Sequence, residues 1–265
     1  ASMSQWYHLS CIDAPMRIFG RRSSLSASLI DFIFAPIWLL LRWRYFMSTK
    51  IKAVIFDMDG VLIDAKEWHY EALNQALRIF GMEISRYDHL VTFDGLPTKK
   101  KLEMLTLEQG LPRELHGLLN DLKQQFTMQM VHVHCRPKFV HQYALSRLKT
   151  MGMKVAVCSN SIHDTIDVIM RKADLMGYLD FFLSNQDVTQ AKPDPEIYVK
   201  AISMMGLQPQ ECLIVEDNPN GLLAAKRSGA HVMQVAETDE VNLDNILSHV
   251  AKAEELMNVN ALMEV

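Results

Sequence analysis

The stretch Ile51-Lys-Ala-Val-Ile-Phe-Asp-Met-Asp-Gly60 decides the fold. It is a short apolar run that lacks the alternation of a half-buried strand, and it is followed at once by two aspartates. Such a run is typical of a parallel strand buried on both faces. Similar runs recur at 154–158, 181–183, 212–215 and 231–235, with helical patterns between them. The alternation predicts an α/β protein with a Rossmann-like parallel sheet core.

Residues from about 66 to 135 do not follow this rhythm. They contain helical patterns at 67–80, 98–109 and 113–130, and no clear strand. We therefore predict an all-helical cap domain inserted after the first strand. The predicted boundaries are 50–65 and 146–265 for the α/β core, 66–145 for the cap, and 1–49 for an N-terminal extension.

Composition limits the classes of function. The chain has 265 residues and a formal net charge of −4, so a nucleic-acid partner is not expected. Its four cysteines are widely spaced and form no CxxC pair, which argues against a zinc ribbon and a disulfide framework. A reducing, cytoplasmic location is the simplest prediction. Oligomeric state is not indicated.

The extension at 1–49 differs from the rest of the chain. Its apolar run at 32–41 is interrupted by Pro36 and followed by Arg42, Trp43 and Arg44. A spanning helix needs roughly 20 apolar residues, so this run is too short to cross a membrane. Four interpretations stay open: a packed or dispensable extension, an interfacial anchor with weak membrane-surface contact through 29–46, a translated stretch ahead of a working start at Met47, and a signal peptide.

Polar residues follow the predicted strands at the points where each strand ends. In chain order they are Asp57, Asp59, Ser159, Asn160, Lys192, Glu216 and Asp217. The carboxyl ends of parallel strands lie at one edge of a sheet, so these side chains are expected to meet there. Carboxylates that converge repel each other unless a cation is bound, and all-oxygen ligands favour Mg²⁺. A lysine and a hydroxyl beside them can hold phosphoryl oxygens.

Four segments carry a family resemblance. Asp57-Met-Asp-Gly-Val-Leu-Ile-Asp64, Val157-Cys-Ser-Asn-Ser161, Lys192-Pro-Asp-Pro-Glu-Ile-Tyr198 and Val215-Glu-Asp-Asn-Pro-Asn-Gly-Leu222 resemble the motifs of the haloacid dehalogenase superfamily. The sequence is most similar to the β-phosphoglucomutase-like phosphatase subgroup, over about 50–235. The resemblance implies a small phosphorylated substrate, and an acid at position 59 favours phosphoester cleavage over dehalogenation.

The resemblance also implies roles for the residues at the strand ends. Asp57 would be the nucleophile that forms an aspartyl phosphate, and Asp59 the general acid and then the general base. Ser159 and Lys192, supported by Asn160, would neutralise phosphoryl charge.

The implied Mg²⁺ would be held by Asp57, the backbone carbonyl of Asp59, and Asp217, with Glu216 acting directly or through water. Gly60 would permit the tight turn beside these ligands.

The cap offers further substrate-binding candidates. His69 matches a cap histidine of the mutase, whereas Thr98 occupies the place of its cap arginine and Lys99 lies beside it. The hinge threonine of the mutase is replaced by Ala65, and no clear counterpart of a further cap lysine lies near 127–131. These departures favour a phosphatase.

The predicted function is therefore a Mg²⁺-dependent phosphatase for small phosphorylated metabolites of the sugar- or polyol-phosphate kind. One alternative is a β-phosphoglucomutase-like sugar-phosphate mutase. The other is a non-catalytic, membrane-associated binding protein, which only the extension supports.

Overall fold

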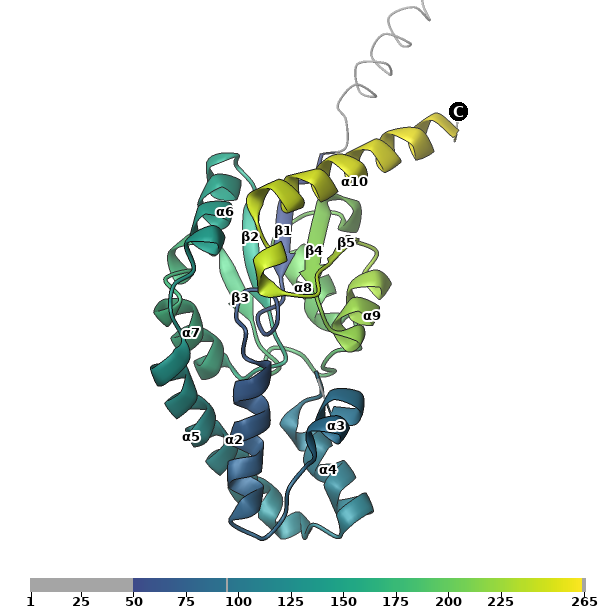
Figure 1. Cartoon of the computed structure of the whole chain (residues 1–265). Helices are drawn as coiled ribbons and strands as arrows, with labels where there is room; N and C mark the ends of the chain where they lie inside the picture. Colours follow the sequence, from purple (N-terminus) through teal and green to yellow (C-terminus); the bar gives the residue numbers. More distant parts are fainter. Residues whose placement is uncertain (1–49, 94, 264–265) are drawn as a thin grey trace, which may run out of the picture. The chain divides into compact units, whose positions relative to one another are not determined.

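The structure is a computed structural model that describes residues 50–93 and 95–263 (Figure 1). The predictions for the extension, including membrane contact through 29–46, lie outside the described residues. Among the helices that are described, none has the length and apolar character needed to cross a membrane.

The centre of the molecule is a five-stranded parallel sheet with the order β3-β2-β1-β4-β5. The strands are β1 (Ala53–Phe56), β2 (Lys154–Cys158), β3 (Phe181–Leu183), β4 (Cys212–Glu216) and β5 (His231–Gln234). The first strand is central, and its Phe56 is paired with Val157 on one side and Val215 on the other. This sheet confirms the predicted Rossmann-like α/β class.

Helices cover both faces of the sheet (Figure 1). They are α6 (Phe139–Thr150), α7 (His163–Lys172), α8 (Glu196–Met204), α9 (Pro219–Arg227) and α10 (Leu243–Met263). Alternate residues of β1 enter two separate cores: Val54 and Phe56 pack with α6, α7 and α10, whereas Ala53 and Ile55 pack with α8 and α9. All four β1 side chains are fully buried, which explains the unbroken apolar run in the sequence.

The helices between β1 and α6 form the helical cap. Its helices are α2 (Lys66–Arg78), α3 (Arg86–Asp88), the π-helical turn η1 (His89–Phe93), α4 (Thr98–Gln109) and α5 (His116–His134). Helix α2 packs along α5, and the described cap residues contain no strand. The predicted cap boundary at 145 falls inside α6, whose Leu145 and Leu148 pack in the core under the sheet.

Short 3₁₀ turns connect these elements, at η2 (Arg113–Leu115), η3 (Met176–Tyr178), η4 (Pro209–Glu211) and η5 (Thr238–Glu240).

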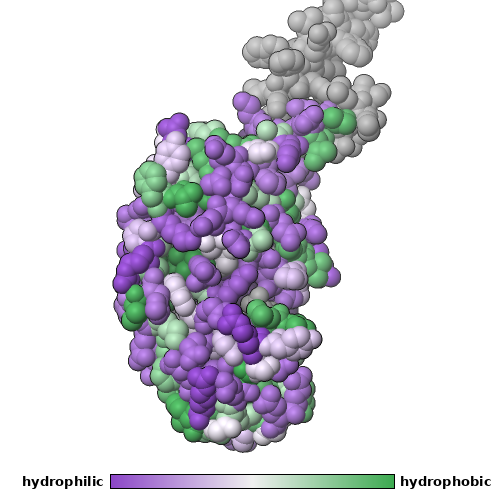
Figure 2. Space-filling view, in the orientation of Figure 1, coloured by the Kyte–Doolittle hydropathy of each residue, from purple (hydrophilic) through white to green (hydrophobic). Residues whose placement is uncertain are grey.

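On the face drawn in Figure 2, apolar residues form small separate groups among polar ones. Isolated apolar residues of this kind are normal on a protein surface, so this face indicates no broad apolar docking area.

The cap has an apolar core of its own, which gives a matched test. Leu105 is fully buried in that core, whereas Leu107, two residues further along α4, is 79% exposed. We expect Leu105→Ala to lower the free energy of unfolding by about 2–5 kcal/mol because it leaves a cavity, and Leu107→Ala by less than about 0.5 kcal/mol. Urea denaturation followed by circular dichroism measures both, and equal losses would contradict the packing described.

Candidate active site

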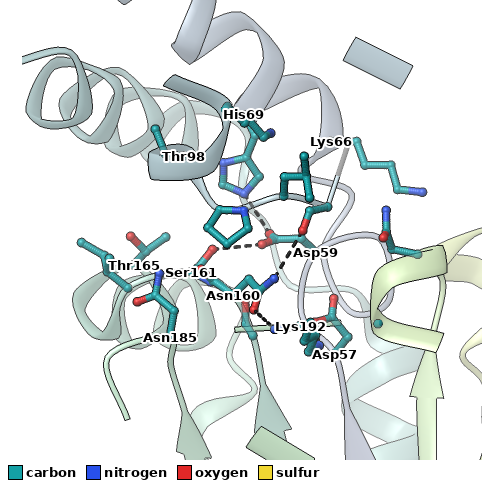
Figure 3. Close-up of a pocket in the computed structure, with 18 of the residues that line it drawn as sticks. Asp57, Asp59, Lys66, His69, Thr98, Asn160, Ser161, Thr165, Asn185 and Lys192 are labelled. Carbon is teal, nitrogen blue, oxygen red and sulfur yellow. Dashed lines mark hydrogen bonds and ion pairs between the residues drawn. The ribbon is translucent and has the colours of Figure 1, made fainter. Parts of the chain in front are cut away.

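A cavity of about 200 Å³ lies between the carboxyl ends of the strands and the cap (Figure 3). Ten of the predicted site residues line it: Asp57, Asp59, His69, Thr98, Lys99, Ser159, Asn160, Lys192, Glu216 and Asp217. Gly60 does not line it and lies directly behind two of its side chains. Residues far apart in the sequence therefore meet at the sheet edge, as their positions after successive strands predict.

Lys192 is a buried positive charge at the core side of the site. Its Nζ donates to Oδ1 of Asp57 at 2.5 Å, to Oε1 of Glu216 at 2.7 Å and to the carbonyl of Cys158 at 2.9 Å. Burial opposes the charged form, but the two carboxylates outweigh it and hold the pKa of Lys192 above its usual value. The ammonium also lies 4.7 Å from the ring centre of Tyr198. Lys192 is therefore a fixed cation beside Asp57.

Glu216 is held by donors on both of its oxygens. Oε1 accepts from Lys192 and from the Tyr198 hydroxyl at 2.7 Å. Oε2 accepts the backbone N–H groups of Asp217 at 3.0 Å and Asn218 at 3.2 Å. A carboxylate with this many fixed donors has little freedom to rotate or to bind a further partner directly.

Three carboxylates form an acidic cluster in the cavity. One oxygen from each of Asp57, Glu216 and Asp217 lies within 4.8 Å of the others. Burial raises the pKa of Asp57 well above its usual value; Glu216, Asp217 and Asp59 raise it too, while Lys192 lowers it. A divalent cation would relieve this repulsion, and an all-oxygen donor set suits a hard ion of the Mg²⁺ type. The residues present therefore fit a divalent metal.

Asp59 lies on the cap side of Asp57. Its Oδ1 is 3.2 Å from Nε2 of His69, and its Oδ2 accepts from the Ser161 hydroxyl at 3.1 Å (Figure 3). Burial by itself would raise the pKa of Asp59, but His69, Ser161 and the charge of Lys123 together lower it. The carboxylate is thus held in its ionised form.

Lys123 of α5 is a site residue that the sequence did not single out. Its Nζ lies 3.2 Å from Nδ1 of His69, so a contact chain links Lys123, His69 and Asp59. Burial lowers the pKa of Lys123 to about 8, and Asp59 opposes this shift. Burial also lowers the pKa of His69. The cap thus has a lysine that faces the site. It lies one helical turn before residues 127–131, where the sequence shows no clear counterpart of the further cap lysine of the mutase.

Asn160 connects the core to the cap. Its Nδ2 donates to the carbonyl of Gly95 at 3.3 Å, and its Oδ1 accepts the backbone N–H of Lys192 at 3.2 Å. Ser159 is buried, and its hydroxyl accepts the backbone N–H of Ser161 at 3.0 Å. Sequence reasoning missed Lys66, Ser161 and Tyr198 as well. Ser161 and Tyr198 each end a quoted motif and Lys66 follows the hinge residue, so all three had a positional signal.

The fold and site define an enzyme that takes an anionic substrate at the carboxyl ends of a parallel sheet. The chain belongs to the haloacid dehalogenase-like hydrolase family, whose model matches residues 54–235. This membership confirms the resemblance found in the sequence.

Relatives agree with this assignment. YhcW of Bacillus subtilis, a candidate phosphatase by name, is 32% identical over 68% of this chain and 80% of its own length. The phosphorylated carbohydrates phosphatase of Thermotoga maritima is 26% identical over 79% of this chain and 98% of its own. A crystal structure of β-phosphoglucomutase from Clostridium difficile has the same fold, with a TM-score of 0.67 and 19% identity over 76% of this chain and 98% of its own.

Two helical glycines test the close packing around Glu216. A Cβ at Gly221 in α9 would overlap the Glu216 carboxylate, whereas a Cβ at Gly117 in α5 would meet no atom within 4 Å. We expect Gly221→Ala to lower stability by about 1–3 kcal/mol and to lower activity at least about tenfold, because Glu216 cannot move without losing its donors. Gly117→Ala should leave activity unchanged and stability equal or slightly higher. Thermal denaturation and hydrolysis of an aryl phosphate measure both effects, and a fully active Gly221→Ala enzyme would refute the role of this contact.

Proposed function

We propose that the protein is a Mg²⁺-dependent phosphatase that hydrolyses small phosphorylated metabolites. The observation that carries the proposal is the contact of Asp57 with the buried Lys192, beside Glu216 and Asp217, in the cavity at the carboxyl ends of the strands. A carboxylate and a phosphate ester are both negatively charged. Positive charge beside both groups is therefore needed before one can attack the other. The family and the phosphatase names of its relatives support the same chemistry.

In the first step, Asp57 attacks phosphorus and the bond from phosphorus to the ester oxygen breaks. Asp59 is ionised in the free site, so it takes up a proton with the substrate, from the phosphate group or from solvent, and gives this proton to the departing alcohol. In the second step, Asp59 takes a proton from water, the water oxygen attacks phosphorus, and the bond to Asp57 breaks, releasing inorganic phosphate. The donors of Ser161 and His69 stabilise the ionised Asp59 that this second step needs.

The acidic cluster supports Asp57 and Asp217 as metal ligands, and the family resemblance implies the backbone carbonyl of Asp59 as a third. Asp57, Asp217 and the backbone carbonyl of Asp59 would hold Mg²⁺, which would supply positive charge between the nucleophile and the phosphate. Glu216 would act through water, because Lys192, Tyr198 and two backbone N–H groups already occupy its oxygens.

The substrate class is proposed more narrowly as a sugar or polyol phosphate. The cavity is lined mainly by polar side chains, and a phosphorylated carbohydrates phosphatase is among the relatives. A mutase of the β-phosphoglucomutase kind is the second candidate, because Lys123 gives the cap a cation beside His69 that could hold a second phosphate. Formation of a sugar-phosphate isomer without net phosphate release would favour the mutase.

Cytoplasmic location and the role of 1–49 stay predictions.

The nucleophile assignment can be tested with an isosteric variant. Asp57→Asn should lower the turnover of an aryl phosphate in Mg²⁺ at least about a thousandfold, because an amide cannot form the acyl phosphate. Asp64→Asn is the matched control: Asp64 lies in the same motif but is exposed and does not line the cavity. Its turnover should stay within about twofold of wild type. Retained turnover in Asp57→Asn, with circular dichroism unchanged in both variants, would overturn the mechanism.

Lys123 predicts a pH dependence of substrate binding. With a pKa of about 8, its ammonium is charged below this pH and loses its charge above it. If the charge attracts the substrate anion, KM should rise up to about tenfold between pH 7 and 9. Lys123→Arg should keep KM constant over that range, and Lys123→Met should show a high, constant KM. A wild-type KM that does not change with pH would exclude this role.

A further inference from the structure

Lys66, the first residue of α2, contacts the acidic cluster from the cap. Its Nζ lies 2.7 Å from Oδ2 of Asp217. Asp217 is one of the three carboxylates that could hold the metal. A cap residue therefore contacts a metal-ligand candidate that belongs to the loop after β4.

The two partners differ in their access to solvent. The Asp217 side chain is 1% exposed, whereas the Lys66 side chain is 34% exposed. Water therefore does little to stabilise the charge of the Asp217 carboxylate. The contact with Lys66 supplies part of that stabilisation. Lys66 can leave at lower cost, because its ammonium can move into water on a long side chain.

The backbone lies close against the pair. Gly60 has a φ of +87°, and a Cβ there would overlap the Asp217 carboxylate and lie 2.7 Å from Cε of Lys66. The lysine and the aspartate thus pack together against the bare backbone of the nucleophile loop. Their contact is therefore part of the packed interior of the site, unlike a surface ion pair between two exposed side chains.

Two cations cannot share one carboxylate without repulsion. The positive charge of Lys66 makes the electrostatic potential at the site less negative, and so less favourable for a second cation, in the same way that a neighbouring charge shifts a pKa. Lys192 also contacts this cluster, but through Asp57 and Glu216. Lys66 contacts Asp217.

We propose that Lys66 is a resident counter-cation of Asp217 with which the divalent metal ion must compete. This inference rests on the metal site of the proposed function. Lys66 would keep Asp217 neutralised before the metal binds and would weaken metal affinity, so that the first turn of the cap sets the metal concentration that the enzyme needs.

Direct binding of Mn²⁺ tests the proposal without any measurement of catalysis. Titration of wild type and variants with Mn²⁺, followed by calorimetry and by the electron paramagnetic resonance signal of the free ion, gives the dissociation constants. Lys66→Met should bind Mn²⁺ about three- to tenfold more tightly than wild type. Lys66→Arg, which keeps the charge, should bind as wild type does. Lys100→Met removes an equal charge from an exposed position of the cap outside the cavity, and its affinity should stay within about twofold of wild type.

A second measurement covers the case in which a variant changes the stability of the protein. A tighter site gives a larger increase in Tm at a fixed Mn²⁺ concentration, so the increase should be larger for Lys66→Met than for wild type. Equal or weaker Mn²⁺ binding by Lys66→Met overturns the inference and leaves the phosphatase proposal intact. Asp217→Asn separates the two proposals: if it binds Mn²⁺ as tightly as wild type, the metal site is wrong and both fail.

Discussion

The ion pair between Lys192 and the carboxylates of Asp57 and Glu216 is the interaction on which the rest of the site depends. All three groups are buried, and removal of one partner of a buried pair costs about 3–5 kcal/mol because the other charge stays behind. The pair ties the loop before α8 to the ends of β1 and β4, the central strand and its neighbour. The backbone N–H of Asp57 donates to the carbonyl of Val215, so the β1–β4 ladder continues to the proposed nucleophile itself.

This arrangement explains why a flexible side chain can serve as a positioned nucleophile. The strand below Asp57 is fully buried on both faces, and the lysine beside it has three partners. Movement of Asp57 would therefore disturb the sheet and the ion pair together. Asp59, two residues later, is held by groups from the cap and from the loop after β2. Asp57, the proposed nucleophile, and Asp59, the proposed acid and base, are thus held in place by different groups.

The core could be predicted from the sequence because β1, β2 and β4 are mainly apolar runs and most polar residues of interest lie at or just after the end of one, whereas Lys192 lies further on, in the loop before α8. Helix α4 likewise has the bounds 98–109 that its pattern predicts. The cap residues facing the site were harder to predict. Which side of α5 faces the cavity depends on how the cap docks, so Lys123 is not distinguishable in the sequence from other polar residues of that helix. The short α3 and the π-helical turn at 86–93 were missed because a few residues carry no helical period.

Part of the cap packs in a core of its own, with Leu73, Leu102 and Leu119 among its members, whereas Val131 of α5 packs in a core of the sheet. Sequence change at the first group can therefore accumulate without opening a cavity beneath the strand that carries Asp57. A family built in this way can vary that part of its cap while the edge of the sheet stays constant, since the two sets of side chains belong to different cores.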